Sequence, residues 1–184
     1  FCPTVGRDVA FGPLNLGLAR DIVSARVSET LEAVGLSGFE DRDTLQLSVG
    51  ERKRVCLAAV LACQPKVLVL DEPFSNLDPR NRRELSTILK DFEGTQLLAT
   101  HDLDRVVDLS DRVLLIDEGQ LRADGATRTI LADRTLMHRH GLEVPHALRS
   151  GSSTTKKVGL PTTIVAYNSD DGSPQQSVAA SSPR

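Results

Sequence analysis

Apolar residues along this chain follow two different spacings. Val23, Val27, Leu31 and Val34 fall on one face of a helix over residues 21–34, and this period predicts an amphipathic helix. Three short apolar runs follow, at residues 67–70, 96–100 and 113–116. Continuous runs of this length are typical of buried strands in a parallel sheet covered on both faces.

Capping signals define two further helices. Ser48, with Glu51 three residues later, forms a capping box sequence, so we expect a helix that continues through Leu61 and stops at Pro65. Asp78 followed by Pro79 is an N-cap with proline at the first helical position.

The remaining segments complete a pattern in which strands and helices alternate. We expect a loop with a short helix at residues 1–20, a polar loop at 37–47 and a helix at 102–109. We also expect a hairpin partner for the third strand at 120–123 and terminal helices within 127–147. This alternation predicts an α/β fold with a mainly parallel sheet. Residues beyond 150 are rich in Ser, Thr, Gly and Pro, which is typical of disorder, with one short strand predicted at 164–167.

Length, net charge and the length of the apolar runs limit the classes of function that this chain can have. The chain has 184 residues, enough for one domain, and its net charge of −3 argues against a nucleic-acid binder. Its apolar runs are too short to span a bilayer. Any membrane association is therefore expected to run through a partner.

Candidate chemistry lies where two of the predicted strands end. Asp71 and Glu72 follow one apolar run and His101 follows the next. In open α/β sheets ligands bind beyond the carboxyl ends of the strands. Asp71 is suited to Mg²⁺ and Glu72 to accepting a proton from water. Taken alone, the acidic pair could be ordinary surface and the histidine structural; their combination favours a site.

The start of the helix after Ser48 is a second candidate site. Its free N–H groups and the positive end of its dipole suit a phosphate, although a plain helix cap explains Ser48 and Gly50 equally well when they are taken alone. The neighbouring Arg52, Lys53 and Arg54 are expected to form a solvated helix face.

Four of these segments together resemble the ATP-binding-cassette (ABC) transporter ATPases. The signature motif corresponds to LSVGERKR at residues 47–54, and the Walker B strand with its glutamate to VLVLDEP at 67–73. The D-loop corresponds to SNLDP at 75–79, and the switch-histidine loop to THD at 100–102. The resemblance covers about residues 1–147. It implies a P-loop NTPase-like sheet flanked by helices, with an inserted helical subdomain and an N-terminal truncation.

The resemblance also implies a domain organisation. Residues 1–147 would be a partial ABC ATPase domain, with a helical signature subdomain at about 14–64, a catalytic core at 65–126 and C-terminal helices at 127–147. Residues 148–184 would be a disordered tail.

The family's mechanism assigns a role to each matching residue, with ATP and Mg²⁺ as cofactors. Asp71 would lie on the Mg²⁺ side, Glu72 would be the catalytic base and His101 would contact the γ-phosphate. Three residues of the signature motif would contact the nucleotide held by a second ABC subunit, in a homo- or heterodimer: Ser48, Gly50 and Glu51. Asp78 would link the two sites across the interface.

Two departures from the family pattern qualify these roles. The phosphate loop G-x-x-x-x-G-K-[ST] occurs nowhere in the 184 residues. It is expected to be missing by truncation, which would leave residues 1–184 inactive alone. The alternative is a non-catalytic partner that lends its signature motif to another subunit. The second departure is Val49, where the signature usually has glycine.

Two segments resemble one branch of the family, the cobalt/nickel-type and energy-coupling-factor importers. The first is residues 4–18, which read TVGRDVAFGP and NLGL with Leu14 between them. The second is residues 138–145, which read HRHGLEVP. The resemblance implies an integral membrane subunit contacted near residues 1–18, peripheral attachment to the cytoplasmic face of the membrane, and no nucleic-acid partner. It argues against a soluble cassette of repair or translation. A nickel site at His138, His140 and His146 is not favoured, because terminal histidines are commonly exposed.

Overall fold

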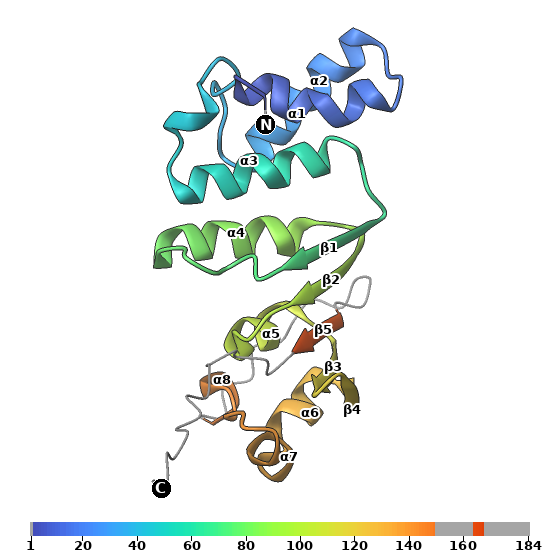
Figure 1. Ribbon diagram of the computed structural model, residues 1–184, viewed down its shortest axis with the longest axis vertical. Helices are drawn as coiled ribbons and strands as arrows, with labels where there is room; N and C mark the ends of the chain where they lie inside the picture. Colours follow the sequence, from blue (N-terminus) through green and yellow to red (C-terminus); the bar gives the residue numbers. More distant parts are fainter. Residues whose placement is uncertain (1, 150–163, 168–184) are drawn as a thin grey trace, which may run out of the picture.

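Three helices form a group at one end of the molecule: α1 (Val5–Asn15), α2 (Arg20–Ala33) and α3 (Val49–Leu61). The computed structural model, drawn in Figure 1, describes residues 2–149 and 164–167. A short 3-10 helix, η1 (Thr44–Gln46), lies in the segment that leads from α2 to α3. The predicted helix at 21–34 is confirmed by α2, which buries Val23, Val27 and Leu31.

Helix α1 is longer than the sequence predicted. We expected a loop with a short helix over residues 1–20, but Val5, Val9 and Pro13 recur every four residues and form one buried helical face. Pro13 lies in the last turn of α1, where only one backbone hydrogen bond is lost to the missing N–H. The core of the helical group includes Val5 and Val9, so α1 packs with α2 and α3. The helical group therefore begins before residue 14, where we expected the helical subdomain to start.

Helix α3 joins the helical group to the rest of the molecule. Val55 and Ala58 belong to the core of the helical group, while Leu57 belongs to the second core, which lies against the sheet. A helix that buries two faces fixes the position of its own N-terminus relative to both parts. The predicted start of this helix is confirmed, since Ser48 caps it in a full capping box.

The sheet has five strands in the order β1-β2-β5-β3-β4. The parallel strands are β1 (Val67–Asp71), β2 (Thr95–Ala99), β5 (Ile164–Tyr167) and β3 (Arg112–Asp117), and β4 (Gln120–Ala126) forms an antiparallel hairpin with β3. The three predicted strands, the hairpin and the short strand at 164–167 are confirmed.

One expectation for the first strand is wrong. We predicted that residues 67–70 are buried on both faces, yet the side chains of Val67 and Val69 are 57% and 66% exposed. Leu68 points the other way and is buried in the core against the sheet. Within the described part of the chain, this end of the sheet is therefore covered on one face.

The remaining helices are α4 (Pro79–Asp91), α5 (Leu103–Leu109), α6 (Thr127–Ala132), α7 (Arg134–Arg139) and α8 (His146–Arg149). Of these, α4 lies between α3 and β1 in Figure 1, and the others lie beside and below the sheet. We predicted a disordered tail from residue 148, but helix α8 extends to Arg149 and β5 covers Ile164–Tyr167. The other residues of the predicted disordered tail, 150–163 and 168–184, lie outside the described residues.

None of the helices in the described part of the chain has the length and apolar character needed to cross a membrane.

Candidate functional site

The first group of predicted site residues meets where β1 and β2 end. These strands pair in parallel with Asp71 opposite Ala99, so Glu72 and His101 both follow adjacent strand ends. The backbone N–H of Glu72 donates to the carbonyl of Ala99 at 2.9 Å. The parallel register therefore brings together residues that lie almost thirty apart in the chain.

The carboxylate of Glu72 is held by the turn after β2. Its Oε1 accepts the backbone N–H of His101 at 2.8 Å and lies 2.7 Å from Nδ1 of the same residue. Its Oε2 accepts the hydroxyl of Thr100 at 3.3 Å. Because a carboxylate only accepts, the proton of the neutral imidazole lies on Nδ1 in this arrangement, which leaves Nε2 for another partner. The two predicted catalytic residues are thus in direct contact.

Asp71 lies at the edge of this group. Its side chain is exposed and has no hydrogen-bond or ion-pair partner among the described residues. The described residues contain no cluster of three or more His, Cys, Asp or Glu that could hold a metal ion. A single free carboxylate is compatible with Mg²⁺, which is usually held by one or two carboxylates together with phosphates and water.

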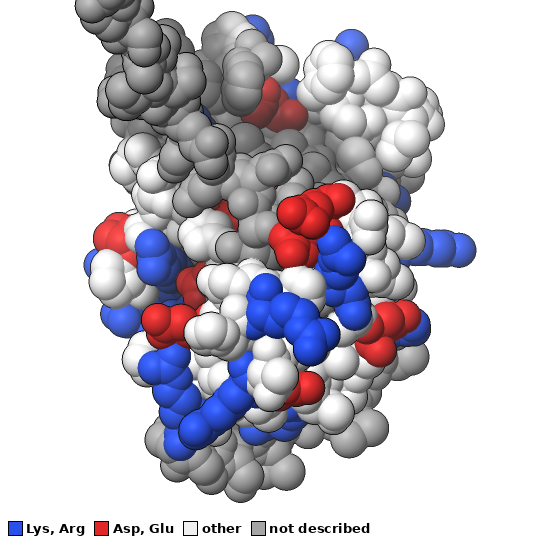
Figure 2. Space-filling model, turned by 60° about the horizontal axis from the view of Figure 1, so that its bottom comes forward, with Lys and Arg blue, Asp and Glu red and all other residues white. Residues whose placement is uncertain are grey.

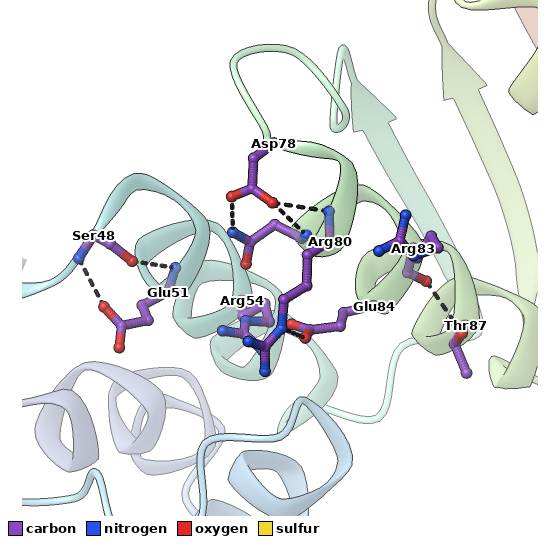
Figure 3. A network of polar contacts seen from close by, with 9 residues as sticks. Ser48, Glu51, Arg54, Asp78, Arg80, Arg83, Glu84 and Thr87 are labelled. Atoms are coloured by element: carbon purple, nitrogen blue, oxygen red, sulfur yellow. Dashed lines mark hydrogen bonds and ion pairs between the residues drawn. The ribbon is translucent and has the colours of Figure 1, made fainter.

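The second group of predicted residues surrounds the start of α3 (Figure 3). The hydroxyl of Ser48 accepts the backbone N–H of Glu51 at 3.3 Å, and the Glu51 carboxylate accepts the backbone N–H of Ser48 at 2.8 Å. The hydrogen bonds from the Ser48 side chain and backbone hold the pKa of Glu51 below its ordinary value. Glu51 is therefore engaged in capping the helix on which Ser48 lies.

Asp78 caps the neighbouring helix, α4. It accepts the backbone N–H groups of Arg80 at 2.8 Å and Asn81 at 3.0 Å, and also the side-chain amide of Asn81. The bonds from the Asn81 backbone and side chain lower the pKa of Asp78. The Asn81 side chain also lies against Gly50, where a Cβ atom would overlap it. Asn81 thus connects Asp78, the N-cap of α4, to Gly50 in the first turn of α3.

A groove of about 740 Å³ joins these residues; its lining includes Ser48, Glu51, Asp78 and Asn81. Across it, Arg54 on α3 pairs with Glu84 on α4 at 2.6 Å, and Arg80 pairs with the same glutamate at 2.9 Å (Figure 3). The predicted site residues therefore form two groups, one at the strand ends and one at this groove, where Gly50 is buried against Asn81 and does not line the groove. The turn between Glu72 and Asp78 connects them.

Three residues that contribute to this arrangement were not predicted as site residues. Lys53 and Arg54 were expected on a solvated helix face; Arg52 is exposed, but Lys53 and Arg54 are partly buried and bonded to other elements. No sequence signal marked Asn81, since its role depends on how closely α3 and α4 approach. Val49 is 53% exposed in the first turn of α3, and its backbone φ is not positive, so the helix accommodates it without strain.

Comparison with known proteins places this geometry in a family. The ABC transporter family profile matches residues 6–75. A Gloeobacter violaceus protein, named as an ABC transporter ATP-binding protein, is 52% identical over 150 residues, which are 80% of this chain and 62% of that protein. The energy-coupling factor transporter ATP-binding protein EcfA of Methanothermobacter thermautotrophicus is 44% identical over 79% of this chain and 48% of its own length.

Solved structures agree with this fold. CbiO1 from Clostridium perfringens, part of the ABC transporter complex CbiONQ, superposes with a TM-score of 0.66 at 36% identity, over 76% of this chain and 57% of that one. The chain thus spans about half to three-fifths of the length of these relatives. With its parallel sheet, its four motifs and these relatives, the chain belongs to the ABC transporter family of ATP-binding proteins.

Proposed function

We propose that the protein is an ATP-binding and ATP-hydrolysing subunit of an ABC importer. The observation that carries this proposal is the contact between Glu72 and His101 at the ends of adjacent parallel strands, beside the exposed carboxylate of Asp71. A base, a hydrogen-bonding imidazole and a free carboxylate are among the groups that take part in hydrolysis of a nucleoside triphosphate.

Each residue at the strand ends has a separate task in this proposal. Glu72 accepts a proton from the water that attacks the terminal phosphate, and the two contacts from His101 orient its carboxylate toward that task. His101 binds the terminal phosphate through its remaining ring nitrogen. Asp71 would hold Mg²⁺, which neutralises charge on the phosphates when it is bound.

The groove between α3 and α4 would receive the nucleotide held by a second ABC subunit. Ser48 and Gly50 lie at the N-terminus of a helix of 13 residues, where free N–H groups and the helix dipole favour an anion. Glu51 supports this helix start. Asp78, in contact with Asn81 beside Gly50, would transmit changes between the two nucleotide sites of a homo- or heterodimer.

A second groove, of about 610 Å³, fits the proposed membrane subunit. It lies between α1 and α2 and is lined by residues that include Arg7, Ala10, Leu14 and Arg20. Phe11 and Leu16 on the same helix end are each 61% exposed. Apolar side chains beside a groove are typical of a surface that receives a partner helix. We therefore propose peripheral attachment through α1, at the cytoplasmic face of the cell membrane.

A nucleic-acid partner is not part of the proposal. Figure 2 shows Lys and Arg interspersed with Asp and Glu on the face that it displays. Several of the basic side chains at this end of the molecule are paired, as in Arg112 with Asp124 at 2.7 Å and Arg149 with Glu143 at 2.6 Å. Nucleic-acid binding usually needs a continuous, unpaired basic surface.

Two observations support a proposal for the cargo class. The relatives include an energy-coupling factor protein and a subunit of CbiONQ, and residues 4–18 and 138–145 resemble the cobalt/nickel-type and energy-coupling-factor importers. We propose a transition-metal ion, cobalt or nickel, or a vitamin as the transported substrate.

A second candidate is a non-catalytic subunit that lends Ser48 and Gly50 to a partner's nucleotide; the position of both residues at the start of α3, apart from Glu72 and His101, is compatible with such a role. The test is to sequence the coding DNA upstream of Phe1, purify the complete gene product and measure ATP binding and hydrolysis. ATP binding with turnover would support the ATPase. An open reading frame without a phosphate loop, together with no ATP binding by this subunit, would support the second candidate.

A further inference from the structure

The side chain of Lys53 crosses from α3 to the turn that carries Glu72. Its ammonium donates to the backbone carbonyls of Ser75 at 2.6 Å, Pro73 at 3.0 Å and Glu72 at 3.4 Å, and to the Ser75 hydroxyl at 3.2 Å. A lysine ammonium has three N–H donors, so this one turn uses all of them. Three of its four acceptors are backbone carbonyls, so the contact fixes the path of the chain at this turn.

The turn that Lys53 holds has an unusual backbone. Glu72 has φ +42° and Asn76 has φ +57°, a region that residues other than glycine seldom occupy and that persists only when the surroundings enforce it. Within the turn, Ser75 donates to the carbonyl of Glu72 through its hydroxyl at 2.8 Å and its N–H at 3.2 Å. Lys53 ties this turn to α3, whereas the bonds of Glu72 to Ala99, Thr100 and His101 tie it to the end of β2.

Two opposing effects act on the charged form of the Lys53 ammonium. Partial burial lowers the pKa of Lys53, and the negative charge of Glu72 opposes that shift. The three carbonyls take the place of the water that the ammonium loses. An uncharged apolar side chain at position 53 would leave the carbonyls of Pro73 and Ser75 without this donor, a cost that the turn could relieve by moving.

We infer that Lys53 is a positioning residue: from the signature helix, it holds the 72–75 turn and thereby sets where the carboxylate of Glu72 lies. This inference rests on the proposed ATPase function. It also links the two groups of site residues, because the helix that begins with Ser48 and Gly50 carries Lys53 one turn later. A nucleotide bound at the start of α3 thus has a direct path to the base in the same subunit.

The first test is structural and independent of activity. Crystal structures of the complete gene product are compared for wild type, K53M, K53R and K90M; Lys90 is an exposed lysine on α4 and serves as the matched control. We expect K53M to lose the positive φ of Glu72 and to move its carboxylate away from His101, while K53R and K90M keep both. A K53M structure with the 72–75 turn unchanged would overturn the inference. If K53M does not fold, K53Q, which loses the charge but keeps amide donors, is used with the same criterion.

The second test measures ATP hydrolysis of the same variants with their partner subunits. We expect K53M to lower kcat by about ten- to a hundredfold, since small displacements of a reacting group have effects of this size, with little change in KM for ATP. K53R should recover most of the rate, which a general loss of folded protein would not allow. Equal kcat for K53M and K90M would refute the inference. An inactive wild type and K90M would instead count against the ATPase proposal, and the backbone at Glu72 would still test Lys53.

Discussion

The Nδ1 atom of His101 lies 2.7 Å from Oε1 of Glu72, and the backbone N–H of His101 donates to the same oxygen at 2.8 Å. One residue thus holds the carboxylate by two bonds, of which only one uses its side chain. A phosphate that engages the imidazole can change the ring contact while the backbone contact remains. The position of the base is therefore partly independent of what the histidine binds.

Replacing Glu72 by Gln should separate ATP binding from ATP hydrolysis. Glutamine keeps an oxygen that can accept the N–H of His101, so the turn keeps its shape, but it is not a base. We expect turnover of the complete protein to fall by about a hundredfold or more while ATP affinity changes little. Steady-state hydrolysis and nucleotide titration measure the two quantities. The control is Glu93→Gln, an exposed glutamate in the loop between α4 and β2; unchanged turnover in Glu72→Gln would remove Glu72 from the role of base.

Replacing Ser48 by Asp should separate helix capping from nucleotide binding. Aspartate is as good an N-cap as serine, whereas Ser48→Ala should cost about 1 kcal/mol of stability. A carboxylate at a phosphate site repels the ligand. We expect Ser48→Asp to keep the unfolding midpoint near that of wild type but to lower ATP turnover in the assembled dimer. Denaturant unfolding and ATPase assays of both variants test this, and full turnover in Ser48→Asp would show that Ser48 acts only as a cap.

Local sequence signals predicted the elements around the site well. The pair Ser48 and Glu51 marked the start of α3, and Asp78 with Pro79 marked the start of α4, because caps depend on neighbouring residues alone. The apolar runs correctly predicted the strands whose ends bring Glu72 and His101 together.

The errors concern features that are determined by packing between segments distant in the sequence. Because of Pro13 we did not predict the full length of α1. Its regular face, with Val5 and Val9, is stabilised by contact with α2 and α3. The exposure of Val67 and Val69 depends on what covers the sheet, which the strand's own sequence does not encode. Lys53 and Asn81 are polar residues on helices, and only the approach of α3 to α4 and to the 72–75 turn gives them partners.

The contact between Gly50 and Asn81 predicts a compensating pair of substitutions. A Cβ atom on Gly50 would overlap the Asn81 side chain, and forcing extra atoms into a packed contact costs about 1–3 kcal/mol. We expect Gly50→Ala to destabilise the protein and Asn81→Ala in the same molecule to recover part of the loss. A double-mutant cycle by denaturant unfolding measures this coupling. Val49→Ala, at an exposed neighbouring position, is the control; additive effects of the two substitutions would contradict the contact.

The capping box predicts a loss of stability in acid. The folded-state pKa of Glu51 is depressed below its ordinary value of 4.5 by hydrogen bonds from Ser48. A depressed pKa means that the folded state binds fewer protons, so this contribution is present above pH 4.5 and is lost as the pH falls through the folded-state pKa. Glutamine also completes a capping box but does not titrate. Unfolding free energies measured from about pH 6 to pH 3 should therefore fall less steeply for Glu51→Gln than for wild type, and equal slopes would rule out Glu51 as a contributor.

The groove between α1 and α2 predicts a substitution that uncouples the protein from its membrane subunit. Leu14 lies in this groove and is 50% exposed, so lysine can replace it without opening a cavity. The new charge would stand beside Arg7 and Arg20, and an apolar partner helix would have to bury it. We expect Leu14→Lys to lower recovery of the membrane subunit in affinity purification while nucleotide binding is retained, since α1 is separated from the strand ends by α3 and α4 in Figure 1. Leu121→Lys, at a 57% exposed position on β4, is the matched control. Loss of the membrane subunit from both variants would point to a general effect of surface charge, and its retention in both would place the membrane contact elsewhere.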